Sequence, residues 1–345
     1  MAETGASMRA VIMERVGKAR VLKPTRLPRP QPAPAEALVK VQATSVNPAD
    51  LLLRSGRLII RKPLPHILGS DLAGEIVELG DDVDGWDIGD RVFATFEQLG
   101  CEIDGGYAEY CALPADKLIK LPDDLDFQSA VASGASFAAA LLALVTQGKL
   151  KKADTIVIRG AAGGVGASAV QIAAARGAKV IAICEGAFVA NLHEIGADIV
   201  LEDAGGDLVR QVQVATGENG ASLVLHCNAK LDLEESVDML CAGGRLVIAC
   251  PLSKDSARLN AMDLYQRNLS LHGAYGSVKP KDFAPVLTGL ARGKYRALID
   301  EVMPLSGARK AHRKLEKTPA FGKIILVPDS VLEAAKKPDN WIPID

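Results

Sequence analysis

The chain has 345 residues, 48% of them hydrophobic and 24% charged, with a formal net charge of −2. These values predict a globular protein with room for two cores and exclude a strongly basic surface, so we expect no nucleic-acid or membrane partner. The N-terminal residues lack the features of a secretion signal, and the six cysteines contain no C-x-x-C pair, so we expect a cytoplasmic protein without a zinc cluster.

The first third of the chain has the pattern of a β-rich domain. A proline-rich segment, 24–37, is interpreted as an extended surface connection. A short helix is predicted at 48–55, because Asn47 can cap it and Pro48 suits its first turn. Short β-type runs separated by Gly, Pro and Asp predict strands at 8–13, 37–46, 71–80 and 90–96.

Beyond about residue 125 the pattern becomes an alternation of strands and helices. The apolar run 129–145 is short for a membrane span and is interpreted as a buried helix. Alternation with continuously apolar strands implies a parallel sheet covered on both faces, an α/β fold. The predicted strands are 155–160, 179–184, 198–203, 221–227 and 244–250, with helices at 165–177 and 188–197 and a core element ending at 321–328.

A glycine-rich turn, Ala161-Ala162-Gly163-Gly164-Val165-Gly166, joins the first of these strands to its helix. It departs from G-x-G-x-x-G at the first position, which is Ala. Gly163 would let the backbone approach a pyrophosphate, and Gly166 would let the helix pack tightly on the strand. Because a strand precedes the turn and a helix follows it, we predict a dinucleotide site formed by Ala162, Gly163, Gly164, Val165 and Gly166. A tight turn that binds nothing is the alternative.

The sequence favours NADH over NADPH as the cofactor. Glu185 stands at the end of the second strand, where an acidic residue is expected to bind the ribose 2′-hydroxyl. The loop CEGAFVAN has no Lys or Arg to neutralise a 2′-phosphate. The alternative is that Glu185 points to solvent and a cation from elsewhere serves NADPH.

At this point the chain resembles the medium-chain dehydrogenase/reductase superfamily, in its zinc-free quinone oxidoreductase (zeta-crystallin-like) branch. The matching stretches follow one another through nearly the whole chain: SVNPADLLLRSG (45–56), LGSDLAGEIVELG (68–80), GDRVFATF (89–96), GGYAEYCALPAD (105–116), AAGGVGASAVQIAAARGAKVIA (161–182), GADIVLED (196–203), GGRLVIA (243–249) and FGKIILV (321–327).

The resemblance implies a GroES-like, β-rich catalytic domain and a Rossmann domain with a doubly wound parallel sheet. The expected divisions are 1–128 for the first part of the catalytic domain, 129–272 for the Rossmann domain, and 273–345 for a segment completing the catalytic domain. An active site between the domains is implied, as is a homodimer paired through the Rossmann domains.

Zinc is not expected in this site. The zinc alcohol dehydrogenases of the superfamily carry Gly-His-Glu where this chain reads Gly69-Ser70-Asp71. Without that His and without grouped Cys ligands, a catalytic zinc cannot be assembled. Alcohol oxidation needs a Lewis acid on the oxygen, whereas quinones and activated C=C bonds are already electrophilic.

The resemblance supplies candidate catalytic and pocket residues. Asn47, in VNPxD, matches the family's active-site asparagine, although helix capping explains it equally well. The family often has a tyrosine at the position of Leu52. We predict that the hydroxyl of Tyr275 takes the place of that tyrosine. Phe96 and Tyr107 are assigned to the substrate pocket, with packing and strand roles as alternatives.

The remaining candidates are assigned to the cofactor. Ser136 replaces a family Thr at a helix start and would touch the nicotinamide, or cap the helix instead. The backbone around Asn228 and Ala229 would pass beside the nicotinamide ribose. Lys323 falls on a family position close to the cofactor or at the core edge.

These observations predict an NADH- or NADPH-dependent, zinc-independent reductase of quinones or α,β-unsaturated carbonyls. An enoyl-thioester reductase is the enzyme alternative, but no basic groove for a phosphopantetheine carrier is evident. A cofactor-binding protein with little turnover, like the crystallins and membrane adaptors of this branch, is the alternative of another class.

Overall fold

The computed structural model describes residues 7–228, 232–250, 256–317 and 321–332. The chain divides into two compact units, one of residues 1–135 and 279–345 and the other of residues 136–278. The domain boundaries predicted from the sequence follow residues 128 and 272. The first division falls inside a helix, just after Gly134, whose φ of −14° and ψ of −122° break the helical geometry. An apolar helix that continues across a unit boundary carries no composition change to mark it.

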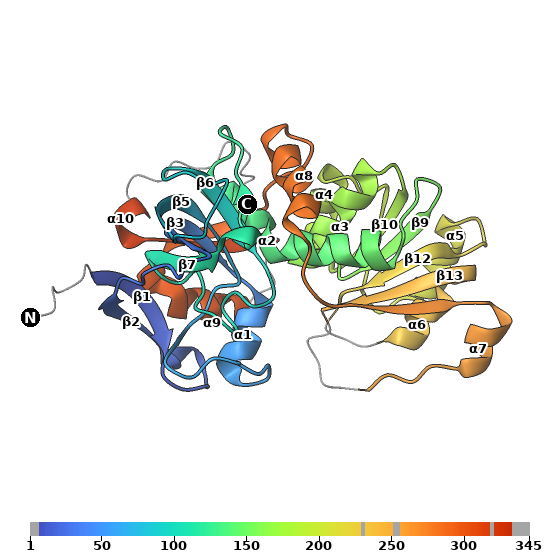
Figure 1. The fold of residues 1–345 in the computed structure, drawn as a ribbon. Helices are drawn as coiled ribbons and strands as arrows, with labels where there is room; N and C mark the ends of the chain where they lie inside the picture. Colours follow the sequence, from blue (N-terminus) through green and yellow to red (C-terminus); the bar gives the residue numbers. More distant parts are fainter. Residues whose placement is uncertain (1–6, 229–231, 251–255, 318–320, 333–345) are drawn as a thin grey trace, which may run out of the picture. The chain divides into compact units, whose positions relative to one another are not determined.

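The first unit is built on β-sheet, as the sequence predicts (Figure 1). One sheet has the strand order β2-β1-β4, and a larger one has the order β15-β16-β3-β5-β6-β8, with β7 also paired to β3. Its elements are β1 (Ser7–Met13), β2 (Leu22–Pro28), β3 (Glu36–Val46), α1 (Pro48–Ser55), β4 (His66–Ile67), β5 (Asp71–Leu79), β6 (Arg91–Thr95), β7 (Tyr110–Pro114), β8 (Ile119–Lys120), α8 (Pro280–Ala291), β15 (Ile299–Pro304), α9 (Ala308–Lys317), β16 (Lys323–Val327) and α10 (Asp329–Leu332).

One predicted connection in this unit is wrong. The proline-rich segment was interpreted as a surface connection, yet its beginning belongs to β2, which pairs along its whole length with β1. Pro24 and Pro28 are tolerated because β2 is an edge strand of its sheet, where a missing N–H costs no ladder bond on the open side. The predicted helix at 48–55 is confirmed as α1, with Asn47 at its N-cap.

The second unit contains a parallel sheet with the strand order β11-β10-β9-β12-β13-β14. Its strands and helices alternate along the chain, which confirms the predicted α/β pattern. The elements are β9 (Thr155–Arg159), α3 (Gly164–Ala175), β10 (Lys179–Cys184), α4 (Val189–Glu194), β11 (Ile199–Glu202), α5 (Leu208–Ala215), β12 (Ala221–His226), α6 (Leu233–Asp238), β13 (Leu240–Ala249), α7 (Ala261–Gln266) and β14 (Ser270–Ala274).

Helices cover both faces of this sheet. Leu208 and Val212 of α5 and Val237 of α6 share a core with one set of strand side chains, among them Val157 and Val224. Side chains alternate along a strand, so the neighbouring residues point to the other face, where α3 packs on β9 and β10. Figure 1 shows α3 and α6 on opposite sides of the sheet, the doubly wound arrangement.

The long apolar helix needs a correction. The sequence predicts that the run 129–145 is too short for a membrane span. Helix α2 (Phe127–Leu141), however, continues as a π-helical turn to Gln147. The resulting stretch of 21 residues, Phe127–Gln147, has a mean hydropathy of 1.8. By length and composition this stretch passes the test for a membrane span. A share of 61% of it is buried inside the protein, which favours the predicted core helix.

Candidate functional site

The glycine turn of the second unit begins where β9 ends. Gly160 has a φ of +80°, which turns the chain out of the strand, and its carbonyl accepts the N–H of Gly163 at 3.1 Å. A Cβ on Gly166 would lie 2.2 Å from the carbonyl oxygen of Gly160. The close packing of helix on strand at Gly166 is therefore confirmed, because no other residue fits there without moving backbone.

Gly163 is not required by the fold itself. A Cβ there would lie 3.4 Å from the Gly160 carbonyl, an ordinary contact, and its φ of −71° and ψ of 162° suit any residue. Gly163 is exposed and is the N-cap of α3, and Ala162, Gly164 and Val165 beside it are half-buried. The first N–H groups of a helix have no partner within it and carry the positive end of its dipole. An exposed, glycine-lined helix start of this kind fits a dinucleotide pyrophosphate.

The carboxyl ends of the neighbouring strands carry the other cofactor candidates. Glu185 follows β10 directly and is exposed. Glu202 ends β11, and a Cβ on Gly186 would lie 2.7 Å from its carboxylate. Burial raises the pKa of the Cys184 thiol to about 11, and the carboxylates of Glu202 and Glu185 add to that rise. Two negative charges thus stand together beside the end of β10.

Asn228 lies against the start of the glycine turn. A Cβ on Gly160 would come within 3.2 Å of the Asn228 Cα and 3.0 Å of the Cys227 carbonyl oxygen. Sequence positions 160 and 228 are therefore adjacent at the strand ends, as a cofactor site requires. Ala229, named with Asn228, lies outside the described residues.

Strand register brings the candidate polar residues of the first unit together. Strand β16 pairs with β3 so that Ile324 faces Val46, which sets Lys323 opposite Asn47 at the end of the ladder. Strand β5 pairs on the other side of β3 so that Leu72 faces Thr44, and Asp71 accepts the backbone N–H of Ser45 at 3.0 Å. These two strand pairings thus place Lys323 and Asp71 beside the start of α1.

Asn47 is the centre of this buried cluster. Its Nδ2 donates to Asp71 Oδ2 at 3.0 Å and to Ser70 Oγ at 3.1 Å, with Ser45 Oγ at 3.4 Å. Its Oδ1 accepts from the Lys323 ammonium. Asn47 is 3% exposed and Lys323 is 6% exposed. We call Asn47, Ser45, Ser70, Asp71 and Lys323 the Asn47 cluster.

Burial alters the ionisation of the groups around Asn47. Desolvation lowers the pKa of Lys323, although the nearby carboxylates of Asp71 and Asp50 oppose that effect. Desolvation raises the pKa of Asp50 to about 7, and the charge of Asp71 adds to it. The N–H of Asn47, at 2.8 Å, and the charge of Lys323 pull in the other direction. Asp50 therefore titrates near neutral pH.

A chain of donors runs from Arg54 to Asp50. Burial, with the charge of Arg54, lowers the pKa of His312 to about 3, so its ring is neutral. Arg54 only donates, so Nδ1 of His312, 3.4 Å away, accepts and the ring proton lies on Nε2. That N–H faces Tyr107 Oη at 3.0 Å, and the Tyr107 hydroxyl donates to Asp50 Oδ2 at 3.4 Å. The arrangement orients Asp50 at the first turn of α1.

Of the residues predicted to line the substrate pocket, which are Leu52, Phe96 and Tyr107, only Tyr107 has a different role in the structure. Tyr107 has no exposed surface and its hydroxyl is engaged by His312 and Asp50, so the structure gives it a core role in place of a pocket role. Phe96 is 8% exposed within an apolar cluster of the same unit. Leu52 is half-buried on α1. The pocket roles of Leu52 and Phe96 stay predictions.

Two further candidates belong to the second unit. Tyr275, chosen as a catalytic hydroxyl, directly follows β14 and is 82% exposed. Its role as a catalytic hydroxyl stays a prediction. Ser136 is 8% exposed and lies within α2, two residues beyond the kink at Gly134.

Sequence reasoning missed Asp50, Arg54 and His312. All three are buried polar residues in helices α1 and α9. They contact residues that lie far away in sequence, as Arg54 does with His312. The only local signal was Asp50 at the third position of a helix whose N-cap is Asn47. That pattern indicates an N-terminal capping interaction and says nothing of the network behind it.

Zinc does not fit the residues present at Ser70. The polar groups around Ser70 are an amide, a carboxylate and an ammonium, and the buried ammonium of Lys323 already bonds to the amide of Asn47. Within the described ranges, no three His, Cys, Asp or Glu side chains gather as metal ligands would. The donor set therefore supports the predicted zinc independence, which stays a prediction.

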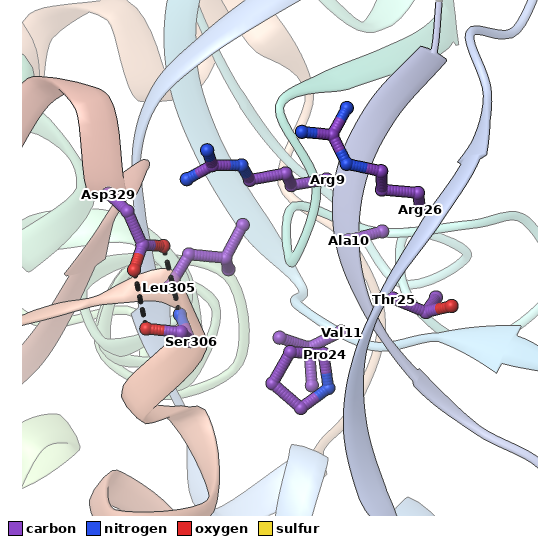
Figure 2. A pocket seen from close by; sticks show the side chains of 9 residues that line it. All are labelled: Arg9, Ala10, Val11, Pro24, Thr25, Arg26, Leu305, Ser306 and Asp329. Atoms are coloured by element: carbon purple, nitrogen blue, oxygen red, sulfur yellow. Dashed lines mark hydrogen bonds between the residues drawn. The ribbon is translucent and has the colours of Figure 1, made fainter.

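The described residues of the first unit also line a pocket of about 290 Å³ (Figure 2). Arg9 and Arg26 extend on one side of it, and on another side Asp329 accepts the backbone N–H of Ser306 at 3.2 Å. None of the predicted site residues lines this pocket. It is therefore distinct from the Asn47 cluster.

Comparison with known proteins adds the family. The model of the alcohol dehydrogenase GroES-like domain matches residues 33–123, and that of the zinc-binding dehydrogenase domain matches residues 164–292. The quinone oxidoreductase of Lama guanicoe is 34% identical over 93% of this chain and 97% of its own length. The human quinone oxidoreductase is 32% identical over 93% of this chain and 98% of its own.

Solved structures agree with these relatives. AibC superposes with a TM-score of 0.89 at 31% identity, covering 94% of this chain and 96% of its own. An NAD-dependent alcohol dehydrogenase gives 0.86 at 31% identity, covering 93% and 99%. The quinone oxidoreductase from Coxiella burnetii gives 0.81 at 27% identity, with the same coverage. The predicted GroES-like and Rossmann domains are thereby confirmed, and the chain is an oxidoreductase that belongs to the medium-chain dehydrogenase/reductase superfamily.

Proposed function

We propose that this protein is an NAD(P)H-dependent reductase of quinones, or of activated α,β-unsaturated carbonyls, that works without zinc. The observation that carries the proposal is the Asn47 cluster: a set of hydrogen-bonding groups around a central amide, which includes an ammonium but no triad of metal-ligating side chains. Such a set can orient an acceptor but cannot polarise an alcohol as a metal does. The names of the curated relatives support the same substrate class.

The chain's own residues would then bind and orient. Bound NAD(P)H supplies a hydride, which reduces an electrophilic acceptor by two electrons. The exposed N-terminal turn of α3, at Ala162–Val165, would hold the pyrophosphate, and Gly163 leaves room for it. Reduction of a quinone leaves a hydroquinone anion that solvent can protonate. No strongly acidic side chain is required, which agrees with Leu52 in place of the family's tyrosine.

We further propose a preference for NADH. Glu185 and Glu202 place two carboxylates beside the end of β10, where a 2′-phosphate would be repelled and a ribose hydroxyl could donate. NADPH selection would need a cation at this end of the sheet. The segment from Cys184 to Asn191 contains neither Lys nor Arg.

The test is a direct assay of cofactor oxidation. Purified protein is mixed with NADH or NADPH, and absorbance loss is followed with 1,4-benzoquinone, 9,10-phenanthrenequinone and a simple enone. We expect turnover with at least one quinone and a higher kcat/KM with NADH. Cofactor binding seen by fluorescence, with no acceptor-dependent oxidation, would contradict the proposal and identify a cofactor-binding protein with little turnover.

A further inference from the structure

Within the Asn47 cluster, only the Ser70 side chain belongs to a residue that is partly exposed in the described structure. Ser45 and Asp71 have no exposed surface, and Asn47 and Lys323 are buried. Ser70 lies between Gly69 and the start of β5, and its backbone carbonyl accepts from Thr95 at 3.4 Å. Ser70 is therefore the residue of the cluster that a molecule from solvent can reach without displacing buried side chains.

The direction of each hydrogen bond follows from Lys323. An ammonium only donates, so the Asn47 atom that faces it must be the carbonyl Oδ1. This fixes the orientation of the amide, and its two N–H bonds then point to Asp71 Oδ2 and Ser70 Oγ. Ser70 Oγ is an acceptor in this contact. Its own proton is donated to no group in the described part of the chain.

The amide of Asn47 has no N–H donor to spare. Its carbonyl is engaged by Lys323, and its two N–H groups have acceptors at 3.0 and 3.1 Å. An acceptor molecule that bonded directly to this amide would have to break one of these contacts inside a buried site, where an unsatisfied group costs about 1–3 kcal/mol. The sequence-based role of Asn47 in holding substrate oxygen is therefore better filled by its neighbour.

We propose that the Ser70 hydroxyl donates a hydrogen bond to the carbonyl oxygen of the acceptor, and that Asn47 and Lys323 are positioning residues that aim it. This inference rests on the proposed function. Hydride addition to a quinone carries two electrons into the ring, and the carbonyl oxygen becomes an oxyanion. Ser70 keeps its proton throughout and stabilises that charge, and solvent supplies the proton that completes the hydroquinone.

The first experiment separates a bond made in the transition state from mere packing. Ser70→Ala and Ser70→Thr are compared with wild type, using 1,4-benzoquinone at saturating NADH. Removal of one oxyanion donor costs about 100- to 1,000-fold in well-studied enzymes, and a partly exposed site should lose about 10- to 100-fold in kcat. We expect that loss in Ser70→Ala with little change in KM, and near-complete retention in Ser70→Thr, which keeps the hydroxyl.

Ser133→Ala is the matched control. Ser133 is a fully buried serine of the same unit, and its hydroxyl donates to Ala130 of its own helix and not to the Asn47 cluster. Its kcat should match wild type. If Ser70→Ala does not fold, Ser70→Cys keeps the volume with a weaker donor and should show a similar loss. A Ser70→Ala or Ser70→Cys enzyme with kcat within twofold of wild type overturns the inference while leaving the proposed function intact.

A second readout needs no turnover. 4-Nitrophenolate resembles a hydroquinone anion, and its absorbance reports binding in the presence of NAD⁺. We expect the dissociation constant to rise by at least about threefold in Ser70→Ala and to stay unchanged in Ser133→Ala. If no quinone is reduced by wild type yet this difference is found, the proposed function fails and the Ser70 donor stands. Equal phenolate binding in wild type and Ser70→Ala counts against the donor.

Discussion

At the scale of single residues, the fold strongly alters the ionisation of Asp50. Its carboxylate has no exposed surface, and its pKa is raised to about 7 because burial disfavours the charged form. The folded-state pKa thus lies above the unfolded value of 3.8. The folded protein holds the Asp50 proton more tightly than the unfolded chain does. The stabilisation is complete below pH 4 and is lost as the pH rises to about 7.

We therefore predict that Asp50→Asn flattens the pH dependence of thermal stability. Wild type should lose more stability between pH 5 and pH 8 than the variant, since only wild type must ionise a buried carboxyl. Between these two pH values the loss is at most about 3 kcal/mol, since about two pKa units at 1.36 kcal/mol each fall in this range. Thermal unfolding midpoints at both pH values, for both proteins, measure it. Parallel pH profiles would show that Asp50 is already ionised without cost.

Residue charge also sets the predicted cofactor preference. Replacing Glu185 and Glu202 by Gln should lower the ratio of kcat/KM for NADH over NADPH by about tenfold or more, because two repulsive charges facing a 2′-phosphate are removed. Glu218→Gln is the control. It removes one exposed carboxylate of the same unit from the segment that leads into β12, away from the strand ends. An unchanged ratio in the double variant would place the adenosine ribose elsewhere.

At the scale of elements, the turn between β9 and α3 contains glycine for two different reasons. Gly166 serves packing, since its Cβ would meet the Gly160 carbonyl at 2.2 Å. Packing does not require glycine at position 163, since a Cβ there would meet that carbonyl at 3.4 Å in an ordinary backbone conformation. The two positions form a matched pair for a single substitution.

We predict that Gly163→Ala folds like wild type but binds NADH at least about tenfold more weakly, because the methyl group occupies the space of the pyrophosphate. Gly166→Ala should lower the unfolding midpoint by several degrees, since backbone must move to admit its Cβ. Unfolding midpoints and fluorescence titration with NADH test both statements. Wild-type affinity in Gly163→Ala would mean that the turn is structural only.

The elements also show what sequence can and cannot predict. Strands β9 to β13 of the second unit, with helices α3 and α4, follow from the sequence, because the strands are short and largely apolar runs between turn residues. Strand β2 does not, since its prolines are acceptable only at a sheet edge, and edge position is a property of the assembled sheet. Asn47 and Lys323 were each singled out, but their contact depends on the pairing of β3 with β16, which no local pattern encodes.

At the scale of the whole molecule, the resemblance gave the domains, and the strand ladders supplied the site's geometry. Tyr275 illustrates the limit. The resemblance points to Tyr275 as a replacement for the missing family tyrosine, and the structure places this residue at an exposed sheet edge without testing that role.

The exposed edge strand β14 argues for self-association. It ends the sheet order of the second unit, and an open strand edge offers unpaired N–H and C=O groups to another chain. Large apolar side chains are exposed in the elements around it: Tyr275 is 82% exposed, Tyr265 is 79% and Met262 is 55%. An edge strand flanked by exposed aromatic residues is the surface that a symmetric dimer would cover.

We predict a homodimer paired through this edge, with β14 of one copy beside β14 of the other. Light scattering coupled to size-exclusion chromatography should give about twice the chain mass of 36.3 kDa at micromolar concentration. Tyr265→Asp with Tyr275→Asp should shift the protein toward monomer, because charges buried at an apolar interface are costly. Arg9→Asp with Arg26→Asp, on the pocket of the first unit, is the control and should remain dimeric. A monomeric wild type, or a double tyrosine variant that stays dimeric, would assign these exposed side chains no role in assembly.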